Sequence, residues 1–110
     1  MTERQIEKWL GNQVKALGCL YYKFISPGTA GVPDRIIVLP CGLVIFTELK
    51  AENGKLSASQ ERCLNILKDH SCDATVIRGM AEAESLVRDI KRHLEIEDSH
   101  EDSHEDSHAV

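Results

Sequence analysis

The sequence of 110 residues lacks several features that would assign a protein to a broad class. It has no run approaching 18 consecutive apolar residues, so we expect no membrane-spanning helix. Its first residues lack the apolar core of a secretory signal peptide. Its four cysteines form no CxxC pair, which argues against a zinc ribbon, and without secretion they are expected to be reduced thiols. We therefore expect a cytoplasmic protein without membrane contacts.

Lysine and arginine are absent from positions 97–110, where the sequence Glu-Asp-Ser-His is repeated three times. This segment holds 6 of the 18 acidic residues, so positions 1–96 carry 13 Lys and Arg against 12 Asp and Glu. The near-neutral balance leaves nucleic acid open as a partner. We predict a folded domain over residues 1–96 and a disordered acidic tail over 97–110, because the repeat has no apolar side chains to bury.

Helical and strand patterns alternate along the folded part. Ile6, Leu10 and Val14 recur at helical spacing between Thr2, a capping residue, and Gly18. The predicted elements are a helix over 3–17, strands over 20–25, 35–39 and 43–49, a helix from Ser57 or Ser59 to about His70, a strand over 74–77 and a helix over about 81–94. The second and third strands are apolar at successive positions, so both sheet faces should be covered. This order indicates an α/β fold, a mixed central sheet flanked by helices.

The hairpin formed by the second and third strands brings charged residues together. If its turn is centred on Cys41, with Gly42 in the left-handed position, Asp34 lies opposite Glu48. Directly opposed side chains share a face, and Lys50, two residues beyond Glu48, points to that face too. A bulge at Gly42 would shift the register by one and separate these side chains.

Two close carboxylates repel each other unless a cation lies between them. Carboxylate oxygens are ligands that Mg²⁺ selects, with water and phosphate completing its coordination. Lys50 could orient or deprotonate an attacking water, or hold a phosphate oxygen. The alternative is an ordinary ion-pair cluster of Asp34, Glu48 and Lys50 at the end of a sheet.

The segments Gly31–Asp34 and Glu48–Lys50, followed by Gln60 near the start of a helix, resemble the PD-(D/E)xK nuclease superfamily. More closely, the chain from about Glu3 to about Ile90 is similar to the VRR-NUC (virus-type replication-repair nuclease) family in its short, stand-alone form. The resemblance implies an αβββαβ(α) restriction-endonuclease-like core. It also implies phosphodiester hydrolysis that depends on Mg²⁺ or Mn²⁺ and uses no organic cofactor.

The resemblance further implies roles for individual residues. Asp34, Glu48 and the backbone carbonyl of Leu49 would bind the metal, and Lys50 would be the catalytic lysine. The family also uses a glutamate of the first helix, for which Glu7 and Glu3 are candidates. We prefer Glu7, acting on the metal directly or through water; the alternative for either residue is stabilisation of the helix dipole.

The remaining polar candidates each have two interpretations. Gln60 is a polar residue at a helix start or a hydrogen-bond partner of Lys50 or of the metal-bound water. Tyr21 and Tyr22 favour sheet packing over base stacking. Four basic side chains could grip phosphates or simply be solvated: Lys23, Lys55, Arg62 and Arg78.

The stand-alone family members look like homodimeric resolvases of four-way DNA junctions, active in DNA repair and recombination. We therefore expect a DNA endonuclease selective for branched DNA, in the cytoplasm of a bacterial or phage-infected cell. A single small domain has one site, so two symmetric cuts call for a homodimer. The alternatives are a flap or other single-nick nuclease, a restriction-type or RNA-directed nuclease, and a catalytically silent DNA-binding module.

Overall fold

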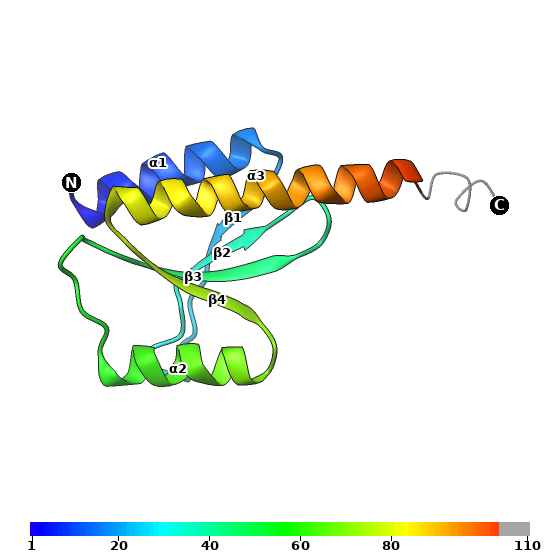
Figure 1. The fold of residues 1–110 in the computed structure, drawn as a ribbon. Coiled ribbons are helices and arrows are strands. Elements are labelled where there is room, and N and C mark those ends of the chain that lie inside the picture. Colours follow the sequence, from blue (N-terminus) through cyan, green and yellow to red (C-terminus); the bar gives the residue numbers. More distant parts are fainter. Residues whose placement is uncertain (104–110) are drawn as a thin grey trace.

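Within the described residues, a four-stranded mixed sheet forms the centre of the fold (Figure 1). The computed structural model describes the backbone of residues 1–103 and the side chains of residues 1–96. The strands lie in the order β1 (Leu20–Lys23), β2 (Arg35–Val38), β3 (Val44–Lys50) and β4 (Asp73–Arg78). Strands β1 and β3 each pair antiparallel with β2, and β4 is parallel to β3.

Helices lie on both sides of this sheet. Helices α1 (Glu3–Ala16) and α3 (Gly79–Ser103) pack together on one face, and α2 (Ala58–Asp69) lies on the opposite side, as Figure 1 shows. A parallel neighbour for β3 requires a crossover connection, and α2 supplies it between β3 and β4. The predicted fold class, an α/β domain with a mixed sheet flanked by helices, is confirmed.

Capping boxes fix where the first two helices begin. The Thr2 hydroxyl accepts from the Gln5 backbone N–H, and the Gln5 side chain accepts from the Thr2 backbone N–H. Ser57 and Gln60 make the same reciprocal pair at α2, so Ser57 rather than Ser59 is the N-cap. Each pair satisfies two N–H groups that a helix start would otherwise leave open.

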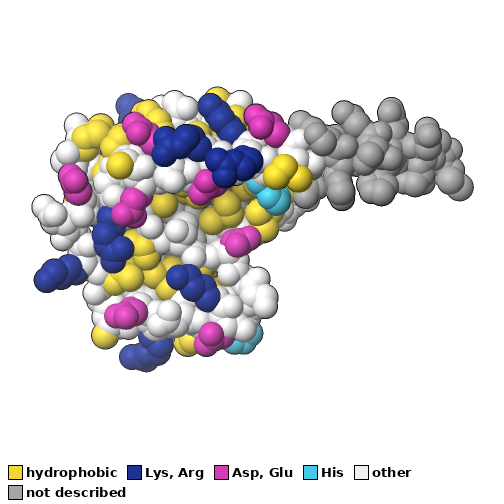
Figure 2. All heavy atoms as spheres, in the orientation of Figure 1, with side chains coloured by type: hydrophobic (Ala, Val, Ile, Leu, Met, Phe, Trp, Pro, Cys, Tyr) yellow, Lys and Arg dark blue, Asp and Glu magenta, His cyan; other side chains and the backbone are white. Residues whose placement is uncertain are grey.

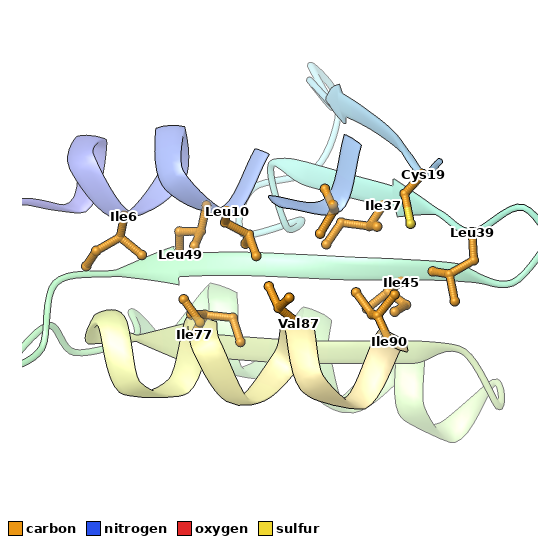
Figure 3. Packing of buried hydrophobic residues seen from close by; sticks show 12 residues of the cluster. Ile6, Leu10, Cys19, Ile37, Leu39, Ile45, Leu49, Ile77, Val87 and Ile90 are labelled. Carbon is orange, nitrogen blue, oxygen red and sulfur yellow. The ribbon is translucent and has the colours of Figure 1, made fainter. Parts of the chain in front are cut away.

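The hydrophobic core lies between the sheet and the pair α1 and α3 (Figure 3). Side chains of α1 at helical spacing meet alternate residues of β2 and β3, while α3 closes the core over β4. The labelled members in Figure 3 are Ile6, Leu10, Cys19, Ile37, Leu39, Ile45, Leu49, Ile77, Val87 and Ile90.

Helix α3 is longer than the sequence pattern predicts. It begins at Gly79 and ends at Ser103, whereas we expect a helix over about 81–94 and disorder from residue 97. For residues 97–103 the backbone is helical instead, because the Glu-Asp-Ser-His repeat contains no Gly or Pro that would end the helix. The expectation of disorder for 104–110 falls outside the described residues. The division of the chain at residue 96 stays a prediction.

The distribution of charges and the reduced state of the cysteines in the described residues agree with what the composition predicts. On the face seen in Figure 2, acidic and basic side chains are interspersed, and hydrophobic side chains show between the layer of α3 and that of α2. The four cysteines are free, as expected. None of the helices within residues 1–103 has the length and apolarity needed to cross a bilayer.

Candidate active site

The β2–β3 hairpin sets the relative positions of Asp34 and Glu48. Arg35 lies opposite Thr47, and the pairing continues in the same register toward the turn. One further step outward places Asp34 opposite Glu48. This is the predicted register, so the shift by one residue does not occur.

The turn itself shows why the register holds. The Leu39 backbone N–H donates to the Leu43 carbonyl at 2.9 Å, and the Gly42 N–H donates back to the Leu39 carbonyl at 2.8 Å. Gly42 has a φ of +95°, in the left-handed region that glycine adopts without strain. The three-residue connection is therefore closed without an insertion that would displace Glu48.

The loop before Asp34 is held between β1 and the start of α2. Gly31 has a φ of +86°, and a Cβ at this position would lie 2.4 Å from the backbone of Ser59. Only glycine allows so close an approach. On the other side, the Phe24 N–H donates to the Asp34 carbonyl at 2.8 Å. The close approach to Ser59 explains the glycine at position 31, three residues before Asp34. Together with the bond from Phe24, it fixes the position of Asp34.

Glu48 is a buried carboxylate, with 5% of its surface exposed. Burial is the main cause that raises its pKa from 4.5 to about 7, and the negative charge of Asp34 raises it further. The cation of Lys50 opposes this shift, and the charge of Glu3 adds to it. Within the protein alone, the negative charge of ionised Glu48 is therefore only partly balanced by the positive charge of Lys50.

The two carboxylates meet the requirements of a divalent cation site. Oδ1 of Asp34 is buried and has no hydrogen-bond partner, which leaves it available as a ligand. A cation between the two carboxylates would favour the ionised form of Glu48 and so oppose the rise of its pKa. Among the described residues, no group of three or more His, Cys, Asp and Glu is placed to hold a metal. Two carboxylates agree with Mg²⁺, which keeps several waters and takes one or two carboxylates.

Two basic residues end the strands at the same edge of the sheet. Lys50, the last residue of β3, is half-buried and lies two positions beyond Glu48 on the same face. Its neighbour in the parallel pairing is Arg78, the last residue of β4, whose Nε donates to the Gly54 carbonyl at 3.1 Å. The structure thus brings Asp34, Glu48 and Lys50 together as predicted, with Arg78 beside them.

Glu7 lies in a different environment from the one expected at the metal. Its carboxylate forms an ion pair with the guanidinium of Arg35. Arg35 follows Asp34, and successive strand residues point to opposite faces, so this ion pair lies on the face covered by α1. Glu3 is the acid of the first helix whose charge acts on Glu48. A role for Glu7 at the metal stays a prediction.

Gln60 caps a helix and Leu49 packs in the core. The side-chain oxygen of Gln60 accepts from the Ser57 N–H at 2.9 Å, so the helix-start interpretation describes the contact that is present. Leu49 is buried in the core, with 1% of its surface exposed. A bond from Gln60 to Lys50 or to a water, and a metal contact of the Leu49 carbonyl, stay predictions.

Arg35 is a residue that the sequence patterns did not single out. Besides its ion pair with Glu7, its guanidinium carbon lies 5.4 Å from the centroid of the Tyr21 ring. The Tyr21 hydroxyl donates to the Glu7 carbonyl at 3.3 Å, and its ring leaves no room for a Cβ on Gly11. Burial raises the pKa of Tyr21 to about 12. The alternation of side chains along a strand could have predicted this contact, because it places Arg35 on the opposite face from Asp34, toward the first helix.

Comparisons with known proteins agree with this geometry. The family model of the VRR-NUC domain matches residues 4–81. A solved structure described as a VRR_NUC domain superposes with a TM-score of 0.72 at 25% sequence identity, covering 80% of this chain and 97% of the other.

A curated relative comes from a phage. The protein named "Putative nuclease p44" of Acyrthosiphon pisum secondary endosymbiont phage 1 is 48% identical over 62 residues, which are 56% of this chain and 67% of the phage protein. Residues 4–81, which the family model matches, contain the hairpin and both carboxylates, and the fold agrees with the solved domain. The chain therefore belongs to the VRR-NUC domain family, a family of nuclease domains.

Proposed function

We propose that this protein is a structure-selective DNA endonuclease that hydrolyses phosphodiester bonds and requires Mg²⁺ or Mn²⁺. The observation that carries the proposal is the pair of opposed carboxylates, Asp34 with an unpartnered buried oxygen and Glu48 with a raised pKa. A protein that only binds DNA gains nothing from two carboxylates near phosphates, because they repel the backbone. Membership of the VRR-NUC family supports nuclease activity.

The residues divide the chemistry as follows. Asp34 and Glu48 would hold the cation, with the Leu49 carbonyl as a further ligand. When bound, the cation would polarise the scissile phosphate and lower the pKa of an attacking water. Lys50, at the end of β3, holds a phosphate oxygen or orients the water. Arg78 lies beside Lys50 and places a second positive charge where the substrate backbone would approach.

Glu7 is the proposed first-helix acid at the metal. Because its carboxylate pairs with Arg35, its role has to be compared with that of Glu3. We expect Glu7→Gln to lower the cleavage rate more than Glu3→Gln. If Glu3→Gln has the larger effect, then Glu3, whose charge already acts on Glu48, takes the role at the metal. Gln60 is proposed to support Lys50 or the attacking water from the first turn of α2.

The substrate we propose is branched DNA, in particular a four-way junction, cut by a homodimer. A domain of this size carries one catalytic site, and resolving a junction requires two cuts. Two-fold symmetry in the substrate is matched by two-fold symmetry in the protein. We place this activity in DNA repair or recombination in the cytoplasm of a bacterial or phage-infected cell.

The test is a cleavage assay with labelled four-way, flap, splayed-arm and plain duplex DNA, each with Mg²⁺, Mn²⁺ or EDTA. We expect two opposed cuts in the four-way junction with either metal and none with EDTA. A single nick in flap DNA would replace junction resolution by a flap-directed activity. Binding without cleavage under every condition would identify a silent DNA-binding module of the same fold.

A further inference from the structure

The two edge strands of the sheet, β1 and β4, have different surroundings. At the β1 edge, Tyr21 packs against α1 as predicted, whereas Tyr22 is 55% exposed, so the expected cover of both sheet faces is met only in part. At the opposite edge, β4 pairs with β3 on its inner side and with no strand of the described chain on its outer side. Helix α3 lies on one side of β4 and α2 on the other (Figure 1).

The outer backbone edge of β4 is open along most of its length. An edge strand presents a row of N–H and C=O groups to which a further strand can be added. Within the described residues, no backbone hydrogen bond joins Asp73–Ile77 to a segment other than β3. At the end of the strand the edge is occupied, because the Arg78 N–H donates to the Glu82 carboxylate at 2.9 Å. The open stretch is therefore the part of β4 before Arg78.

A groove runs beside this open stretch, between β4 and α3. Its volume of about 380 Å³ lies in the range of ligand-binding clefts. A smaller hollow of about 190 Å³ continues it along β4 and shares Thr75, Leu86 and Asp89 with it. Figure 2 shows hydrophobic side chains on this face between the layer of α3 and that of α2. The apolar lining of the groove comes from the hairpin and from α3: Leu39, Leu43, Ile45, Leu86 and Ile90.

Apart from His93, the ionisable residues that line the groove and the smaller hollow are acidic. Asp73 lies at the start of β4 and Asp89 on α3, and both are exposed. Glu82 lines the smaller hollow at the other end of β4. Among the described residues, no Lys or Arg lines either space; Arg92 lines the next hollow, toward the end of α3. The groove therefore combines an apolar lining with negative charge.

This combination selects the kind of occupant. Acidic side chains repel the DNA backbone, and they repel the acidic repeat at positions 97–110 of the same chain. A metal ion is not favoured either, because no three His, Cys, Asp or Glu side chains of the described part are placed to hold one. A segment of another protein that carries both apolar and basic side chains matches the lining and its charge.

We propose that β4 and the groove beside it bind an extended segment of a partner protein, which adds to the sheet as a further strand next to β4. The inference goes beyond the proposed nuclease function. Every second side chain of a strand faces the same side, so the segment carries an apolar side chain that enters the groove and a Lys or Arg two positions away on each side. The apolar side chain meets Leu43 and Leu86, and the cations reach Asp73 and Asp89.

A segment bound at β4 leaves the candidate active site free. Glu48 pairs with Val76, and the residue before Val76 is Thr75, which lines the groove. Successive strand residues point to opposite faces, so the groove and the carboxylates of Glu48 and Asp34 lie on opposite faces of the sheet. The partner can therefore stay bound while the site acts on its substrate.

The experiment titrates the isotope-labelled full chain with a synthetic peptide, acetyl-Thr-Lys-Thr-Leu-Thr-Lys-Thr-amide, and follows the backbone amide signals by NMR. Thr favours the extended conformation and leaves Lys, Leu and Lys on one side of the strand. We expect saturable shifts of the amide signals of Asp73–Ile77, slower hydrogen exchange at the outward amides of this stretch, and no change at the amides of Leu20–Lys23 in β1.

Charge reversal at the groove tests the acidic lining. The variant is the double substitution Asp73→Lys and Asp89→Lys. The matched control is Glu84→Lys with Glu95→Lys, since both glutamates are exposed on α3 and line neither the groove nor the smaller hollow. We expect the dissociation constant of the peptide to rise at least about tenfold in the variant and to stay within about twofold in the control.

Two methylated peptides test the backbone pairing without any change to the protein. One is methylated at the backbone nitrogens of Lys and Leu, and the other at those of the Thr residues between them, so the side chains are unchanged. Because a strand pairs with its neighbour through alternate residues, one of these peptides should lose binding and the other should keep it.

Three results would overturn the inference. The first is the absence of saturable shifts up to about 1 mM peptide, the weak end of measurable affinity. The second is equal weakening by the groove variant and its control, which would reduce the contact to unspecific attraction between charges. The third is equal binding, or equal loss of binding, by the two methylated peptides, which would exclude strand addition. If the groove variant fails to fold, the methylated peptides decide with the wild-type protein.

Discussion

Glu7 and Arg35 form an ion pair that ties the first helix to the strand directly behind Asp34. Arg35 and Asp34 are consecutive, so the ion pair that holds Arg35 also restrains the backbone that carries Asp34. The contact joins the covered face of the sheet, where α1 packs, to the end of the hairpin that carries the carboxylates. We infer that the ion pair keeps α1 and the catalytic end in a fixed relation.

Replacing Arg35 by Met should lower the free energy of unfolding by about 1.5–3 kcal/mol, the range for a hydrogen bond to a charged group. Glu7→Gln should cost a similar amount, and the double variant should cost less than the sum, because both changes remove the same contact. Urea unfolding of the three variants measures this coupling. Arg92→Met, on the exposed side of α3, is the control and should be near neutral. Strictly additive effects would show that the ion pair contributes nothing.

Asp34→Asn should leave the metal-free protein as stable as the wild type or slightly more stable. The reason is that the negative charge of Asp34 raises the pKa of Glu48, so its removal relieves repulsion. The rise in melting temperature on adding Mn²⁺ should disappear, since a cation ligand is lost. Thermal melts with Mn²⁺ and with EDTA check both parts, and Asp69→Asn in the last turn of α2 serves as the control. A full Mn²⁺ response in Asp34→Asn would remove Asp34 from the site.

The raised pKa of Glu48 predicts a specific pH dependence of stability. Its pKa is about 7 in the folded protein against 4.5 ordinarily, so between these values the folded state binds more protons than the unfolded state. The contribution of this group to stability is therefore complete below about pH 4.5 and falls as the pH rises toward 7. The shift corresponds to a loss of about 3 kcal/mol.

Glu48→Gln should abolish this decline, because Gln does not titrate. Urea unfolding of the variant and the wild type, without metal, should give a stability difference that grows in favour of Gln between about pH 5 and 8. Addition of Mn²⁺ should flatten the wild-type curve, since a cation favours the ionised carboxylate. A stability difference that is the same at every pH would show that Glu48 titrates normally.

Lys50→Ala should separate catalysis from metal binding. Lys50 carries no ligand oxygen, so the variant should still bind Mn²⁺ in calorimetry, while cleavage falls by at least about 100-fold, the usual scale for a lost acid–base or water-orienting group. Its cation lowers the pKa of Glu48, so removing it should shift metal binding to higher pH. Lys68→Ala, exposed in the last turn of α2, is the matched control. An active Lys50→Ala enzyme would contradict the catalytic role.

Local patterns in the sequence were enough to predict the elements and the hairpin. The order of helices and strands, the Thr2 cap and the left-handed turn at Gly42 depend on neighbours within a few residues, and the structure confirms them. The register that sets Asp34 opposite Glu48 also follows from one short turn, so it could be deduced before the strands were seen. The extent of α3 could not, because nothing in the repeat either ends a helix or buries it.

Contacts between distant segments were decided by the tertiary structure alone. The pairing of Glu7 with Arg35 joins residues 28 positions apart, and it depends on which face of the sheet α1 covers. The burial that raises the pKa of Glu48 comes from the packed chain, and no pattern within β3 specifies it. The exposure of Tyr22 follows from α2 lying over β4. Sequence periodicity tells which side chains share a face, but only the packed chain determines what covers that face.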